Sequence, residues 1–120
     1  MAEHNDLGKR GEEAAVAFLR SLGMNILETN WRLRRYEIDI VAQEGPLLVI
    51  VEVKTRKTNY FGDPQEFVTR AKQKQLIEAA NAYLEQKNSN LEVRFDIASI
   101  LYNDQKLVVH LIKDAFTALG

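Results

Sequence analysis

The sequence predicts a layered α/β or α+β domain with the order helix, three strands, helix, two strands. Two segments repeat apolar residues every three to four positions, as amphipathic helices do, and other segments are rich in valine and isoleucine. The 120 residues are 46% hydrophobic and 28% charged, which is sufficient for one compact domain spanning residues 1–120.

The first helix is expected to begin at Asn5 or Asp6, because either side chain can cap it. Apolar or small residues then recur on one face as far as Leu22, and Gly23 is a natural stop. After this helix, residues 26–33 are expected to be extended.

The next segment predicts a β-hairpin. Residues 36–43 alternate between apolar and polar side chains, and residues 44–46 read as a turn. Residues 47–54 are apolar on both faces for much of their length, as in a central strand of a sheet.

The second half of the chain repeats the pattern. Residues 55–64 carry Gly62 and Pro64 and predict a loop. Thr69 can cap a helix that runs to about Gln86. Strands are expected at 91–101 and 106–112, separated by a turn at 103–104. The apolar stripe of the second helix is expected to comprise Ala71, Leu76, Ala79, Ala80, Tyr83 and Leu84.

The hairpin register brings two acidic residues together. If residues 45–46 form a two-residue loop, Glu44 pairs with Leu47 and, counting outward, Asp39 pairs with Glu52. Directly opposed residues share a face of the sheet. That face is expected to carry Glu37, Asp39, Val41, Leu48, Ile50, Glu52 and Lys54.

Two opposed carboxylates repel each other, and Glu52 lies in an otherwise apolar strand where an unpaired charge is unfavourable. A hard divalent cation such as Mg²⁺ would offset both charges. Lys54, two residues beyond Glu52, could then orient or help deprotonate an attacking water. The alternative is a structural cluster in which Lys54 and a nearby arginine neutralise the acids.

Glu12 is a further candidate. It lies on the border of the first helix's apolar stripe and could face the acidic site over the edge of the sheet. The alternative is a glutamate favoured only by the dipole at a helix N-terminus.

Charge and composition limit the function classes. The net charge of −1 does not indicate a nucleic-acid-binding protein, although residues 32–74 hold nine basic against six acidic residues. The absence of cysteine excludes disulfides and thiolate zinc sites. The longest apolar run, residues 46–51, is too short to span a membrane, and residues 1–6 do not read as a secretory signal. A cytoplasmic location is therefore the default expectation.

Several ordered motifs then resemble a known family. They are Gly8-x-x-Gly11-Glu12-x-x-Ala15, Asn30-Trp31-Arg32, Glu37-Ile38-Asp39-Ile40, Val51-Glu52-Val53-Lys54-Thr55-Arg56, Gly62, Lys72, Arg94-Phe95-Asp96 and Ala115-Phe116. Together they resemble the YraN-like family of uncharacterised bacterial proteins. This family is similar to the restriction-endonuclease-like superfamily with its PD-(D/E)-x-K signature, and especially to archaeal Holliday-junction resolvases.

The resemblance implies a restriction-endonuclease-like mixed β-sheet flanked by helices. It also implies that Asp39, Glu52 and the Val53 carbonyl bind the metal, that Lys54 is the catalytic lysine, and that Glu12 joins the site. Glu37 matches a family glutamate and is an accessory candidate. Where the family usually has a glycine, this chain has Tyr36, which is expected to pack or to stack on a base or sugar.

The first functional hypothesis is a Mg²⁺- or Mn²⁺-dependent endonuclease with one or two ions, acting on DNA. No base-reading motif is evident, which favours branched or junction DNA over a specific sequence, and a homodimer would suit a junction. The residues expected to hold the DNA backbone are Arg32, Arg34, Arg35, Arg56, Lys57 and Lys72. The alternatives are a nucleic-acid-binding module that does not cut, and an interaction or regulatory protein without a nucleic-acid role.

Overall fold

The computed structural model describes residues 2–57 and 68–118. Over these residues the order of elements is helix, three strands, helix, two strands, as the sequence predicts. The elements are α1 (Ala2–Ser21), β1 (Asn25–Leu33), β2 (Tyr36–Glu44), β3 (Leu47–Arg56), α3 (Arg70–Gln86), β4 (Glu92–Tyr102) and β5 (Leu107–Phe116).

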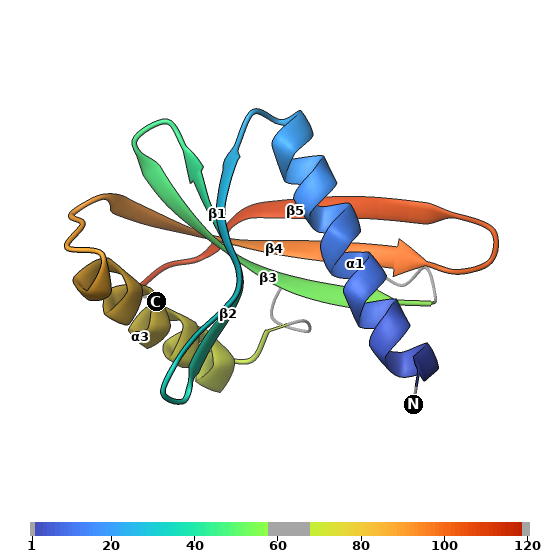
Figure 1. The fold of residues 1–120 in the computed structure, drawn as a ribbon, viewed down its shortest axis with the longest axis horizontal. Coiled ribbons are helices and arrows are strands. Elements are labelled where there is room, and N and C mark those ends of the chain that lie inside the picture. The colour runs from blue at the N-terminus through green and yellow to red at the C-terminus, as the bar shows by residue number, and fades with distance from the viewer. Residues whose placement is uncertain (1, 58–67, 119–120) are drawn as a thin grey trace.

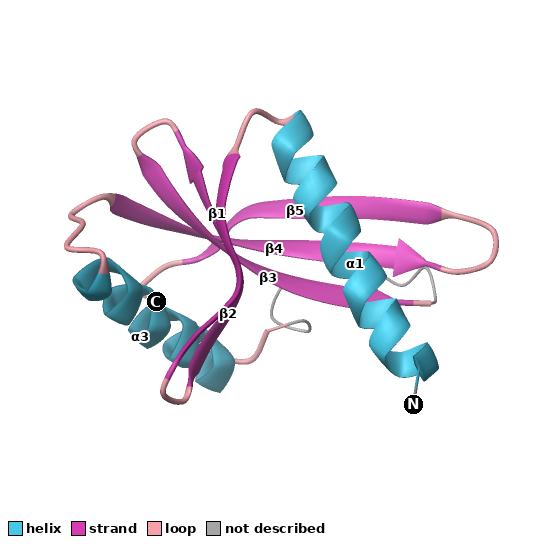
Figure 2. Cartoon of the chain, in the orientation of Figure 1, coloured by secondary structure: helices cyan, strands magenta, loops and turns pink. Residues whose placement is uncertain are grey.

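The strands form one mixed sheet in the order β1-β2-β3-β4-β5. The central pair, β3 and β4, is parallel, and the other three pairs are antiparallel. A parallel pair needs a crossover connection, and α3 lies within it. The expected α/β class with a mixed sheet is therefore confirmed, and the strands twist strongly across the sheet (Figure 2).

Strand β3 separates two apolar cores. Leu48 and Ile50 lie in the core beneath α3, whereas Val49 and Val51 lie in the core beneath α1. The two helices therefore cover opposite faces of the sheet, and α1 crosses it diagonally (Figure 1). Burial on both faces confirms that residues 47–54 belong to a central strand, which continues to Arg56.

The ends of α1 differ in how well the sequence predicts them. Gly23 ends the helix as expected, with φ of 91° and a bond from its N–H to the Arg20 carbonyl. The predicted start was wrong: α1 begins at Ala2, so Asn5 and Asp6 lie inside the helix and not at its first position. No proline or glycine precedes Asn5, so nothing in the covalent backbone stops the helix there.

Helix α3 confirms the predicted cap, because the Thr69 side chain accepts a bond from the Lys72 N–H. Four stripe residues are buried as expected: Leu76, Ala79, Ala80 and Tyr83. Leu84 is partly buried, but Ala71 is exposed and its assignment to the stripe was wrong. At about 100° per residue, Ala71 lies about 130° around the helix from the centre of the other four, outside the buried stripe.

Two predicted boundaries were also wrong. Thr55 and Arg56, assigned to a loop, continue β3, and the last strand extends to Phe116 instead of residue 112. Gly62 and Pro64 lie outside the described residues. Within the described parts of the chain, no helix is long and apolar enough to cross a membrane.

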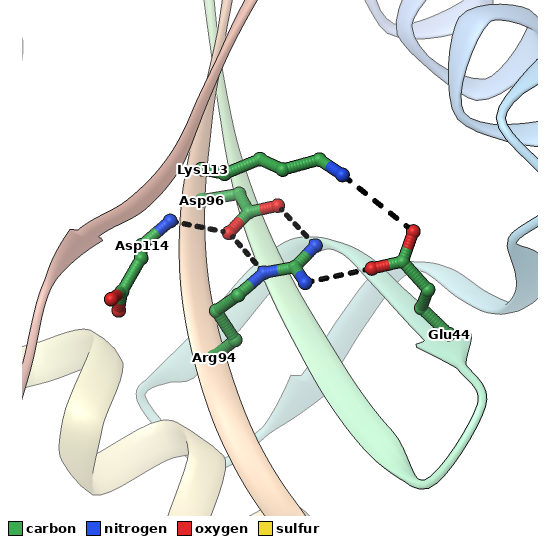
Figure 3. Close-up of polar contacts among 5 residues, drawn as sticks. All are labelled: Glu44, Arg94, Asp96, Lys113 and Asp114. Carbon is green, nitrogen blue, oxygen red and sulfur yellow. Dashed lines mark hydrogen bonds and ion pairs between the residues drawn. The ribbon is translucent and has the colours of Figure 1, made fainter.

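A charge network around the buried Asp96 ties β2, β4 and β5 together (Figure 3). The Arg94 guanidinium donates to both carboxylate oxygens of Asp96, at 2.9 and 3.0 Å, and to Glu44 Oε1 at 2.7 Å. Asp96 also accepts the Asp114 N–H at 3.0 Å, and Lys113 lies 3.7 Å from Glu44. The bond from Arg94 lowers the pKa of Glu44.

Candidate functional site

The candidate site lies where β2 and β3 separate. Their ladder begins at Glu44↔Leu47, which confirms the predicted register, and its last described pair is Ile40↔Val51. The expected pair of Asp39 with Glu52 is not part of it. The Asp39 carboxylate instead accepts the Val53 N–H at 2.8 Å, so a side chain takes the place of a backbone partner.

The regular alternation of side chains along β2 is interrupted at this point. Ile38 and Val41 both lie in the core beneath α3, although residues three apart in a regular strand point to opposite faces. On the neighbouring strand, Asn30 lies between the pairs Thr29↔Ile40 and Trp31↔Ile38 and has a left-handed φ of 52°. The two irregularities coincide, and they direct Asp39 toward the gap between β2 and β3.

Glu52 projects from β3 and is only 6% exposed. Its Oε2 atom lies 3.7 Å from the Lys54 ammonium and 3.9 Å from the Lys72 ammonium. Burial raises the pKa of Glu52 to about 7; the Asp39 charge raises it too, whereas Lys72 and Lys54 lower it. The two acids therefore lie close enough to repel, as the sequence predicts, even though they are not a ladder pair.

The donor set fits a hard divalent cation. In an extended strand the N–H and C=O of one residue point to the same side, so the Val53 carbonyl shares the side on which its N–H meets Asp39. Within residues 2–57 and 68–118, no three His, Cys, Asp or Glu side chains gather closely enough to hold a metal alone. A cation here would rely on Asp39, Glu52, a carbonyl and several waters, which suits Mg²⁺.

Glu12 faces the same place from α1. A pocket of about 480 Å³ has Glu12, Asn30 and Asp39 in its wall, together with Leu7, Gly8, Lys9, Val53 and Thr55. Burial raises the pKa of Glu12, a bond from Asn30 lowers it, and the Asp39 charge raises it. Glu12 thus lies within electrostatic reach of Asp39, as a first-helix acid in the site requires, while Glu13 is exposed.

Gly11 explains why α1 can come this close. It is buried, and a β-carbon at this position would overlap the Thr55 hydroxyl of β3. The glycine therefore permits direct contact between helix and strand and places Glu12 beside the gap.

Sequence reasoning missed Asn30 as a site residue. Its Nδ2 donates to Glu12 Oε1 at 2.6 Å, so it holds the carboxylate that faces Asp39. Asparagine tolerates the left-handed conformation better than most residues. An asparagine inside a predicted strand was the available signal.

The six basic residues expected to hold DNA lie on several elements. Lys72 reaches Glu52 and so belongs to the site itself. Arg56 and Lys57 follow Lys54 along the chain at the end of β3. The other three lie at the β1–β2 hairpin, whose tip lies beside α3 (Figure 1): Arg32, Arg34 and Arg35.

The hairpin also contains Glu37 and Tyr36. Exposed Glu37 pairs with Arg32 at 3.3 Å, an ion pair on the surface away from Glu52. The Tyr36 hydroxyl donates to Glu78 at 3.3 Å, and its ring packs against the core beneath α3. Of the two roles expected for Tyr36, the structure therefore shows packing. Arg35 lies 3.9 Å from the same Glu78.

Known sequences match this chain over a range that includes all the residues of the candidate site. The family model described as "Uncharacterised protein family UPF0102" matches residues 11–100. A UPF0102 protein of Flavobacterium psychrophilum is 49% identical over 116 residues, covering 97% of this chain and 98% of the relative. A UPF0102 protein of Bacteroides thetaiotaomicron is 46% identical over 116 residues, covering 97% and 96%.

Proposed function

The chain belongs to the uncharacterised protein family UPF0102, and from its site we propose that it is a Mg²⁺- or Mn²⁺-dependent endonuclease that hydrolyses DNA. One observation carries this proposal: Glu52 is buried beside a second acid, Asp39, and Asp39 lines a pocket. Burying a carboxylate beside a second acid is unfavourable unless a cation accompanies them. A purely structural ion-pair cluster would need only Glu52 and its lysines, and the second acid, Asp39, would have no role in it.

The residues have distinct roles in this proposal. Asp39, Glu52 and the Val53 carbonyl would hold the metal. When bound, the ion would offset charge on the phosphate and acidify a water. Lys54 would orient the attacking water, whose oxygen would bond to phosphorus as the bond to the 3′ oxygen breaks. The proton of the attacking water would pass to solvent, and the 3′ oxygen would leave with a proton from solvent. Glu12, held by Asn30, would accept hydrogen bonds from water in the pocket.

The DNA would lie across the end of the sheet where β2 and β3 separate. The β1–β2 hairpin and the end of β3 both carry basic residues that could contact phosphates, which position DNA without reading its sequence. Branched or junction DNA is therefore the proposed substrate. The residues proposed to contact its backbone are Arg32, Arg34, Arg35, Arg56 and Lys57.

Cleavage assays test the proposal. Labelled four-way junctions, flaps, duplexes and single strands would be incubated with Mg²⁺ or Mn²⁺ and the wild type, Asp39→Asn, Lys54→Ala or the control Lys74→Ala. We expect metal-dependent cutting of a branched substrate, reduced at least ~100-fold by Asp39→Asn and Lys54→Ala. Lys74 is exposed, and its variant should cut normally. Wild-type protein that cuts nothing with either metal, or an unaffected Asp39→Asn variant, would overturn the proposal.

One observation favours a second candidate, a nucleic-acid-binding module that does not cut. Glu52 already has two ammonium partners, which partly neutralise it without any metal. Such a module would bind DNA with a steep salt dependence, because counterions are released from phosphates, and the binding would be insensitive to chelator. Loss of binding on chelation would instead favour the nuclease.

A further inference from the structure

Two lysines from different elements converge on one carboxylate oxygen. Lys54 lies in β3, two residues from Glu52, and its ammonium is 3.7 Å from Glu52 Oε2. Lys72 lies in the first turn of α3, and its ammonium is 3.9 Å from the same oxygen. The sheet therefore supplies one positive charge to Glu52, and the crossover helix supplies the other.

This arrangement cannot persist unchanged when a divalent cation binds Glu52. A metal ion and two ammonium groups around a single carboxylate would repel one another strongly over such short distances. At least one lysine must give up its contact with Glu52, and the departing ammonium then needs another anion. In a nuclease, the anion nearest the metal is the phosphate that is cleaved.

Lys72 is better placed than Lys54 to make this exchange. The Lys72 and Lys54 side chains are 33% and 37% exposed, so both ammonium groups border solvent and the difference between them lies in the backbone. Its backbone is fixed separately from β3, because its N–H donates to the Thr69 cap. Rotation of the long Lys72 side chain would move its charge without disturbing the strand that carries Glu52 and Lys54.

We propose that Lys72 is a second lysine of the reaction centre, which occupies Glu52 in the free protein and binds the scissile phosphate once metal replaces it. This inference rests on the proposed nuclease function and deepens it. Lys72 would donate a hydrogen bond to a non-bridging phosphate oxygen as the water oxygen attacks phosphorus and the bond to the 3′ oxygen breaks. No proton leaves Lys72 in this step.

The first half of the test measures metal binding without DNA. Mn²⁺ would be titrated calorimetrically into the wild type, Lys72→Ala, Lys72→Arg and Lys74→Ala, each checked for folding by circular dichroism. Because Lys72→Ala removes a competing cation from Glu52, the metal dissociation constant should fall roughly 2- to 5-fold. Lys72→Arg and the control Lys74→Ala should bind Mn²⁺ as the wild type does.

The second half separates catalysis from DNA affinity. On the branched substrate, Lys72→Ala should lower kcat roughly 100-fold with KM nearly unchanged, and Lys72→Arg should restore part of kcat. A lysine that contacts only the outlying backbone would instead weaken DNA binding and reduce the salt slope by about 1, with kcat preserved.

The outcomes distinguish this inference from the function on which it rests. If the wild type binds Mn²⁺ and cuts DNA, but Lys72→Ala changes neither the metal affinity nor kcat, the inference is overturned and the nuclease stands. If the wild type neither binds Mn²⁺ nor cuts, the nuclease proposal fails, and the role of Lys72 fails with it. Tighter Mn²⁺ binding together with a lower kcat in Lys72→Ala supports both.

Discussion

Two buried carboxylates of the same sheet, those of Asp96 and Glu52, differ in how well their partners compensate their charge. Asp96 is 1% exposed and receives two guanidinium bonds at 2.9 and 3.0 Å and a backbone N–H at 3.0 Å (Figure 3). Glu52 is 6% exposed, and its described partners are two ammonium groups at 3.7 and 3.9 Å. A second acid, Asp39, also lies close enough to raise its pKa.

We interpret this difference as one between a structural charge, Asp96, and a proposed metal ligand, Glu52. The partners of Asp96 come from fixed positions and form short, charge-assisted hydrogen bonds, so the network holds β2, β4 and β5 in register. The partners of Glu52 are long, flexible lysines that can withdraw. A buried acid that remains poorly compensated in the free protein is a place where an added cation would stabilise the fold.

The largest expected effect on stability comes from breaking the charge network around Asp96. Arg94→Ala would leave Asp96 buried without its main partner, which should lower the free energy of unfolding by roughly 3–5 kcal/mol in urea denaturation. The control is Arg32→Ala, whose ion pair joins side chains that are 74% and 52% exposed. That variant should change stability by less than about 1 kcal/mol. Equal effects of the two substitutions would contradict the structural role of Arg94.

Neutralising Glu52, whose charge is poorly compensated, should instead raise the free energy of unfolding. Burial raises the pKa of Glu52 from 4.5 to about 7, so the ionised carboxylate destabilises the folded protein. Between these two pH values the folded state binds the extra proton, and stability falls as pH rises. At pH 8 without metal, Glu52→Gln should therefore stabilise the protein by roughly 1–3 kcal/mol.

This gain has a defined pH window. It should be complete above pH 7, shrink as the pH falls from about 7 toward 4.5, and disappear below 4.5. Thermal unfolding of the wild type and Glu52→Gln at pH 4, 6 and 8 measures it. A variant that is destabilised at pH 8 would mean that the two lysines compensate Glu52 fully.

The contact between α1 and β3 should be sensitive to a single methyl group. Gly11→Ala places a β-carbon against the Thr55 side chain and should lower stability by about 1–3 kcal/mol. Gly8→Ala is the matched control, because no described heavy atom lies within 4 Å of its added β-carbon. As a substitution inside a helix, it should raise stability by about 0.5–1 kcal/mol. If Gly11→Ala were as well tolerated, the close approach would be unnecessary.

The smallest effect on stability is expected at Asn30. Asn30→Gly keeps the left-handed backbone and loses the bond to Glu12, so it should lower stability by about 1 kcal/mol or less. The same change should raise the pKa of Glu12, because the bond from Asn30 lowers it. NMR titration of the Glu12 carboxyl carbon measures this shift, and an unchanged pKa would exclude Asn30 as the residue that holds Glu12.

The sequence predicted those parts of the site that depend on local geometry. The two-residue turn at 45–46 determines the hairpin register, and helical periodicity places Glu12 on the border of an apolar stripe. The Asp39–Glu52 ladder pair was wrong because the Asp39 side chain replaces a backbone partner where β2 changes its facing. Strand periodicity contains no information about such a change.

Contacts between distant elements could not be predicted in the same way. The convergence of Lys54 and Lys72 on Glu52 depends on where the crossover helix lies against the sheet, which residue spacing does not specify. The Arg94–Asp96 pair carried a local signal, because residues two apart in a strand share a face. Its completion by Glu44 and the Asp114 N–H requires the tertiary fold.

Calorimetric titration of Mn²⁺ at pH 8 into the wild type, Glu52→Gln and Glu13→Gln tests the central claim most directly. Glu13 is an exposed acid on α1 and serves as the control. We predict saturable binding to the wild type and to Glu13→Gln, and none to Glu52→Gln. Wild-type protein that binds no Mn²⁺, or a Glu52→Gln variant that binds it equally well, would contradict the claim that Glu52 is buried to hold a cation.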